Sequence, residues 1–236
     1  MIEFSHVNGQ LGYLATHTMP WLLYAFGIFS STSRPSVAIP DAPMPGHHAA
    51  LARTMRYISG AGHHGLSYTR QSEGFAITGY CDASRGREMH RTAHGFCKSR
   101  SGGCIATSGA STHAFPQAQQ SAALSTVESE PTALVLRIKN LPTLRRPGAF
   151  GLDASLPTSV VYCDNMSVIM QLHKRDLSVR ARHVRTNLGF VYGATYDGGV
   201  VVTHIHTMKN PANTFTAAEN RDRFRAPVTR LSGHAA

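Results

Sequence analysis

The sequence predicts a mixed α/β fold, in which helices flank one β-sheet. Beyond residue 71, runs rich in strand-forming residues occur at 76–82, 95–99 and 103–107, and a helical segment follows at about 125–140. A strand around Val160, helical segments and a last strand at 200–205 complete the pattern. The chain has 236 residues, 42% of them hydrophobic, which is enough to bury one core, or one domain plus a partial second.

The segment before residue 71 is predicted to be helical. Residues 1–30 read as one or two apolar helices interrupted at Pro20, and residues 31–46, rich in Pro, Ser and Ala, read as a linker. Residues 49–59 carry apolar side chains at near-helical spacing, and glycines follow them. Because polar residues interrupt the apolar tract at 11–29, we expect a packed helix and no membrane partner, with membrane association as a weaker alternative.

The other predicted elements come from turn and periodicity signals. Ser101, Gly102 and Gly103 are predicted to form a hairpin turn between the strands at 95–99 and 103–107. Helices are expected at 166–172 and 181–192, and a short one from about Asn210. Residues 221–236 are predicted to be a disordered tail.

The charge of the chain indicates an anionic partner. Lys and Arg number 23 against 13 acidic residues, a net charge of +10. Nucleic acid is the first candidate, and a generally basic surface is the alternative. The four cysteines form no C-x-x-C pair, which favours reduced thiols and an intracellular protein, cytoplasmic or nuclear. The paired histidines lack the spacing of a zinc site.

Three acidic residues occupy positions that suit a metal-binding cluster. Asp82 closes the strand at 76–82, Asp164 follows the strand around Val160, and Glu130 lies where a helix begins. Two divalent ions about 3.5–4 Å apart on such a cluster can steady the attacking and leaving oxygens of a phosphodiester. The alternative is that both aspartates are ordinary turn residues at strand ends.

The chain resembles copia-type retrotransposon Pol polyproteins, from the end of reverse transcriptase through the ribonuclease H domain. The resemblance runs across almost the whole sequence. Its segments are Met55-Arg56-Tyr57-Ile58-Ser59-Gly60, Gly79-Tyr80-Cys81-Asp82-Ala83, Gln120 with Ala123-Leu124-Ser125-Thr126 and Glu128-Ser129-Glu130, Tyr162-Cys163-Asp164-Asn165-Met166-Ser167, Arg180-Ala181-Arg182-His183-Val184, and Asn210-Pro211-Ala212-Asn213.

The resemblance implies a ribonuclease H-like five-stranded mixed sheet with a carboxylate cluster at its centre. Asp82, Glu130 and Asp164 would bind Mg²⁺ or Mn²⁺, and Asn213 stands where the family has a fourth acid. The implied function is hydrolysis of the RNA strand of RNA/DNA hybrids. The implied organisation is a helical reverse-transcriptase remnant at 1–70, which the polymerase palm would contact, and a ribonuclease H-like domain at 72–220.

Several departures from the family pattern leave the activity open. Pro131 follows the helix glutamate, Arg185 replaces an acid after His183, and Asn213 lacks the charge of a carboxylate. A proline inside the helix would remove a backbone donor. The alternative function is therefore a catalytically impaired or inactive basic nucleic-acid-binding remnant. No Tyr-x-Asp-Asp motif occurs, so no polymerase activity is expected.

A basic stretch is the predicted nucleic-acid interface. Against an RNA/DNA hybrid its side chains would contact phosphates, so binding should weaken steeply with salt. A solvated helical face is the alternative. The stretch comprises Lys174, Arg180, Arg182, His183 and Arg185.

Overall fold

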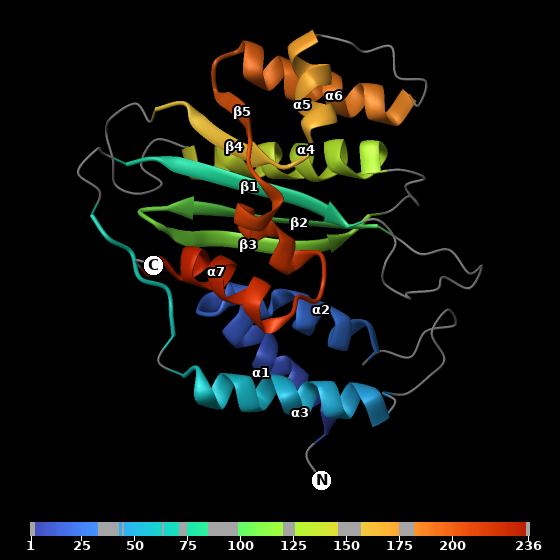
Figure 1. Cartoon of the computed structure of the whole chain (residues 1–236), viewed down its shortest axis with the longest axis vertical. Coiled ribbons are helices and arrows are strands. Elements are labelled where there is room, and N and C mark those ends of the chain that lie inside the picture. Colours follow the sequence, from blue (N-terminus) through green and yellow to red (C-terminus); the bar gives the residue numbers. More distant parts are fainter. Residues whose placement is uncertain are drawn as a thin grey trace.

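The sheet of this computed structural model has five strands in the order β3-β2-β1-β4-β5 (Figure 1). The structure describes residues 3–32, 43, 45–62, 64–70, 75–84, 99–119, 126–145, 157–174 and 182–234. The strands are β1 (Ile77–Ser84), β2 (Arg100–Thr107), β3 (Ala110–Ala118), β4 (Ser159–Cys163) and β5 (Val200–His204). Strands β1, β2 and β3 pair antiparallel, whereas β4 pairs parallel with β1 and β5. The predicted mixed α/β sheet is confirmed.

Three helices cover one face of the sheet and form its larger core. They are α4 (Thr126–Arg145), α5 (Met166–Lys174) and α6 (Arg182–Tyr196). Alternate residues of β1 and β4, such as Cys81 and Val161, point into this core and meet Leu134 and Leu188. The alternation follows from the pleat of a strand, which sends successive side chains to opposite faces.

The N-terminal helices and the C-terminal segment lie on the other side of the sheet, some in contact with its strands and others, such as the helix at 45–60, packed on neighbouring helices (Figure 1). They are α1 (Phe4–His17), η1 (Pro20–Leu22), α2 (Leu23–Thr32), α3 (Pro45–Gly60), η2 (Thr207–Lys209), η3 (Pro211–Phe215) and α7 (Arg221–Ser232). Trp21 and Leu11 share a core with Phe215 and with Cys104 of β2. The division into domains at 1–70 and 72–220 stays a prediction. In the described part of the chain, no helix is both long and apolar enough to cross a membrane.

The predicted hairpin turn at Ser101–Gly103 is wrong. These residues lie inside β2, and the turn to β3 is formed by Ser108 and Gly109, whose φ angles are 50° and 88°. Two consecutive positive φ angles suit a tight two-residue hairpin. Gly102 is needed for packing instead, because a Cβ there would lie 2.8 Å from the Cβ of Phe215. Residues 95–98 of the predicted preceding strand lie outside the described residues.

The predicted disordered tail is wrong for residues 221–232, which form α7. Asn220 caps its start, since the side chain accepts a hydrogen bond from the Arg223 backbone N–H at 3.0 Å. Gly233 ends it in the left-handed conformation, as glycine commonly does after a helix. Val228 and Leu231 lie three residues apart on one face and are buried. The apolar face and both caps together stabilise this helix.

Asn210 ties the C-terminal segment to β1 beside Asp82. Its buried side-chain Nδ2 donates to the Cys81 carbonyl at 2.9 Å, and its Oδ1 accepts from the Ala212 N–H at 3.1 Å. Asn210→Ala should therefore lower the free energy of unfolding by about 1–3 kcal/mol, because it leaves buried backbone groups unpaired. Urea unfolding measures this. The exposed Gln10→Ala control should stay within about 0.5 kcal/mol, and an equally small loss for Asn210→Ala would contradict the prediction.

Candidate active site

The topology brings the three predicted carboxylates to one edge of the sheet. Asp82 lies near the carboxyl end of β1 and Asp164 directly follows β4. Because these neighbouring strands are parallel and Cys81 pairs with Cys163, Asp82 within β1 and Asp164 just after β4 occupy adjacent positions. Glu130 approaches from α4, which packs on β1 and β4. The sequence could anticipate this meeting, since carboxyl ends of adjacent parallel strands share an edge.

Two of the three carboxylates, those of Glu130 and Asp164, are close enough to share a cation, whereas Asp82 is not part of this group. Oxygens of Glu130 and Asp164 and the sulfur of Cys163 all lie within 4.8 Å of one another. Glu130 is 5% exposed, and its Oε2 has no hydrogen-bond partner among the described residues. Asp82 accepts a short hydrogen bond from the Thr216 hydroxyl. A buried carboxylate oxygen without a donor is the kind of ligand a divalent metal ion would satisfy.

The electrostatics of the cluster favour a bound cation or proton. Burial raises the pKa of Asp82 from 3.8 to about 6, and the nearby Asp164 and Glu219 carboxylates add to the rise, while the Thr216 hydroxyl opposes it. Burial also raises the pKa of Glu130 well above its usual value, helped by Cys163, Asp82 and Asp164. Both shifts reflect the cost of holding negative charges together away from water.

Stability of the metal-free protein should therefore depend on pH. A folded-state pKa above the unfolded value means that the folded state holds the proton more tightly, so the Asp82 contribution to stability falls as pH rises from about 4 to about 6 and then levels off. The Asp82 share is about 1–3 kcal/mol. Urea unfolding with a chelator across this range measures it, and Asp82→Asn should flatten the fall. An unchanged profile in that variant would rule out the raised pKa.

Glu130 is held by a buried glutamine that the sequence analysis did not select. Gln119 donates from Nε2 to the Ser101 hydroxyl at 2.8 Å and to the Ser129 carbonyl at 2.9 Å. This pair of bonds joins the end of β3 to the residue before Glu130. Pro131 is the sixth residue of α4 and therefore occupies the helix interior, where its missing N–H removes a backbone donor. Gln119 therefore ties the first turns of α4 to the end of β3.

Asp164 lies in a short turn that Asn165 stabilises. The Asn165 Oδ1 accepts from the N–H groups of Ser167 at 3.0 Å and Val168 at 3.3 Å. Asparagine is favoured at this helix-capping position because its side chain satisfies free N–H groups of the first turn. The cap fixes the path from β4 to α5 and with it the backbone of Asp164.

Asn213 makes no described contact with the carboxylates. Its Nδ2 donates to the Thr207 carbonyl at 2.8 Å, and its buried Oδ1 has no partner in the described part of the chain. Its role as the fourth site residue stays a prediction. The structure instead brings Thr216 and Glu219 to Asp82. The sequence offered one signal for Glu219, which is an acidic residue six positions after Asn213.

The predicted nucleic-acid interface is only partly described. Lys174 ends α5, and Arg182 and Arg185 lie in the first turn of α6; all three are exposed. Asn187 of α6 donates to the Thr132 hydroxyl of α4 at 3.1 Å, two residues beyond Glu130, so this end of α6 lies beside the carboxylate site. Arg180 and the His183 side chain lie outside the described residues. Nucleic-acid binding by this stretch stays a prediction.

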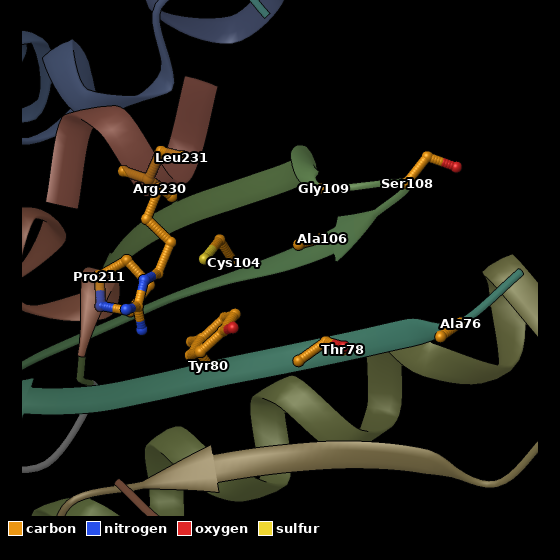
Figure 2. A pocket seen from close by; sticks show the side chains of 10 residues that line it. All are labelled: Ala76, Thr78, Tyr80, Cys104, Ala106, Ser108, Gly109, Pro211, Arg230 and Leu231. Carbon is orange, nitrogen blue, oxygen red and sulfur yellow. The ribbon is translucent and has the colours of Figure 1, made fainter. Parts of the chain in front are cut away.

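A separate cavity of about 140 Å³ lies beside the first half of β1, at Thr78 and Tyr80 (Figure 2). Its walls come from β1, β2, η3 and α7, with Thr78, Tyr80, Cys104 and Arg230 among them. Arg230 donates from Nη1 to the Lys209 carbonyl at 2.9 Å. None of the three carboxylates lines this cavity, so it is distinct from the candidate active site.

No protein-family model matches the chain, but individual proteins do. It is 30% identical over 135 residues to the Secreted RxLR effector protein 161 of Plasmopara viticola, covering 56% of this chain and 84% of that protein. It is 24% identical over 224 residues to the Retrovirus-related Pol polyprotein from transposon RE2 of Arabidopsis thaliana, covering 94% of this chain but only 14% of the polyprotein.

Solved structures also overlap with the chain. The LC11-RNase H1 structure with an RNA/DNA hybrid has a TM-score of 0.45 at 14% identity, over 59% of this chain and 93% of that one. The structure of the foamy viral protease-reverse transcriptase dRH with double-stranded DNA has a TM-score of 0.45 at 14% identity, over 86% of this chain and 32% of that one. The fold assignment rests on the strand order and register rather than on these overlaps. The chain belongs to the same family as the Plasmopara protein, and it is a distant homologue of copia-type Pol polyproteins with a ribonuclease H-like fold.

Proposed function

We propose that the protein is a ribonuclease H-like endonuclease that hydrolyses the RNA strand of RNA/DNA hybrids with two Mg²⁺ or Mn²⁺ ions. The observation that carries the proposal is the closeness of Glu130 and Asp164, with Asp82 near enough to raise the pKa of Glu130 and with a buried Glu130 oxygen that has no donor among the described residues. Oxygen-rich, mutually repelling carboxylates fit hard divalent cations.

Each residue has a distinct task in this proposal. Asp82, Glu130 and Asp164 would hold the ions, which when bound lower the pKa of a water and stabilise the leaving oxygen. The Thr216 hydroxyl orients Asp82, and Gln119 positions Glu130 through the Ser129 carbonyl. Lys174, Arg182 and Arg185 would neutralise backbone phosphates of the hybrid beside the site.

The second candidate function is an inactive, basic nucleic-acid-binding protein of the same fold. Two observations favour it. Pro131 lies inside α4 next to Glu130, where a shift of about an ångström would be costly for catalysis. The Asn213 amide supplies no charge, and its Nδ2 bonds to Thr207 instead of facing the cluster.

Cleavage of a labelled RNA/DNA hybrid separates the two functions. The nuclease proposal expects metal-dependent cleavage of the RNA strand with Mg²⁺ or Mn²⁺, and its loss in Asp164→Asn. Hybrid binding measured at several salt concentrations runs in parallel. Salt-dependent binding by a folded protein without cleavage in either metal would support the inactive alternative instead.

A further inference from the structure

A thiol lies among the proposed metal ligands. Cys163 is the last residue of β4 and is fully buried. Its sulfur lies within 4.8 Å of a carboxylate oxygen of both Glu130 and Asp164. The side chain points to the face of the sheet that α4 covers, where Glu130 approaches. Two oxygens and one sulfur therefore converge on one point from β4, the turn after it and α4.

This donor set differs from that of a site built for magnesium alone. Thiolate sulfur is a soft ligand that prefers Zn²⁺ and similar ions, whereas Mg²⁺ and Mn²⁺ prefer oxygen. Tetrahedral zinc with Zn–S of about 2.3 Å and Zn–O of about 2.1 Å needs donors roughly 3.5 Å apart. The present spread of up to 4.8 Å would have to contract by about 1 Å, within the reach of side-chain rotation.

An independent observation also points to a ligand at this place. Only 5% of Glu130 is exposed, and its Oε2 lacks a hydrogen-bond partner among the described residues. Buried polar atoms in folded proteins are almost always paired. A cation held between Glu130, Cys163 and Asp164 would supply the missing partner.

We propose that Glu130, Cys163 and Asp164 form a site for thiophilic divalent ions of the Zn²⁺ and Cd²⁺ class. Three protein donors leave a fourth position for water, as in open zinc sites. Binding releases the thiol proton of Cys163 to solvent, and the thiolate then ligates the ion. Such an ion would occupy two of the carboxylates needed for Mg²⁺ and would inhibit cleavage. The inhibition, though not the binding, rests on the proposed nuclease function.

Two other buried thiols allow the assignment to be tested residue by residue. Cys81 pairs with Cys163 in register, and its thiol also contacts the Cys163 side chain. It donates to the Tyr162 carbonyl at 3.4 Å and is not part of the 4.8 Å group. Cys104 is equally buried and belongs to the core on the other face of the sheet. Cys104→Ser is therefore the matched control for Cys163→Ser.

Cadmium titration of the full-length, chelator-treated protein tests the site without any need for activity. Cadmium bound to thiolate gives a charge-transfer absorption in the ultraviolet. The wild type and Cys104→Ser should both develop this band up to one ion per chain. Cys163→Ser should lose the band and bind cadmium at least about 10-fold more weakly, because losing a ligand costs no less than losing an outer-shell partner. Circular dichroism shows that each variant is folded.

Absence of the band in the folded wild type, or its persistence in Cys163→Ser, would overturn the proposal. Loss of the band in Cys104→Ser but not in Cys163→Ser would place the thiolate on the other face and overturn it as well. Hybrid cleavage is measured alongside. If the protein cleaves with Mg²⁺, zinc should suppress cleavage and excess Mg²⁺ should restore it. A cadmium band without any cleavage would support the thiophilic metal site and reject the nuclease function. Cleavage without a band would support the nuclease function and reject the thiophilic site.

Discussion

Glu130→Gln should lower the rate of hybrid cleavage by about 100- to 1,000-fold, the scale of removing one electrostatic stabiliser from a catalytic site. The folded protein should lose no stability at neutral pH. Burial and the neighbouring Cys163, Asp82 and Asp164 raise the pKa of Glu130 well above its usual value, so the metal-free folded state favours the neutral acid, which glutamine mimics. Single-turnover cleavage and thermal unfolding measure the two effects separately.

The control for this experiment replaces a carboxylate by an amide far from the site. Asp197 is exposed in the turn before β5, so Asp197→Asn should change neither cleavage nor stability appreciably. Equal cleavage by Glu130→Gln and the wild type would remove Glu130 from the mechanism. A reduced rate accompanied by a large fall in the melting temperature would show misfolding, contrary to the prediction.

Arg137→Met should raise the free energy of unfolding by about 1–4 kcal/mol. Arg137 is fully buried in α4, and none of its three guanidinium nitrogens has a hydrogen-bond partner among the described residues. Its charge lies 4.6 Å from the centre of the Phe115 ring, and burial lowers its pKa to about 10, which still leaves it charged at neutral pH. A contact with an aromatic face offsets only part of the desolvation cost.

Lys139→Met on the same helix is the matched control, because Lys139 is exposed and its replacement should change stability by about 0.5 kcal/mol or less. The buried substitution should raise the melting temperature by roughly 2–4 °C for each kcal/mol gained. Gly79 and Gly103 leave the space that Arg137 fills, since a Cβ at Gly103 would lie 2.7 Å from Nη2. A loss of stability in Arg137→Met would contradict an unpaired buried charge.

The order of secondary-structure elements and the edge where the acids meet could be predicted from local patterns. Runs of β-formers that end in Asp82 and precede Asp164 indicate strands with carboxylates at their carboxyl ends. The apolar spacing at 166–172 and 181–192 predicted helices that the structure extends to Lys174 and Tyr196. These features depend on neighbours in sequence, whose effects act through backbone preference and hydrophobic periodicity.

Contacts between distant segments decided the features that local sequence patterns do not predict, namely the extent of β2 and the residues that surround Asp82. Glycines at 102 and 103 resemble a turn locally, but the close approach of Phe215 and Arg137 requires them inside β2. The burial of Arg137, the bond from Thr216 to Asp82 and the closeness of Glu219 to Asp82 join residues far apart in the chain. The sequence by itself determined which residue types end each strand. Only the tertiary structure decided which of them share a site, because burial and distance belong to the packed chain.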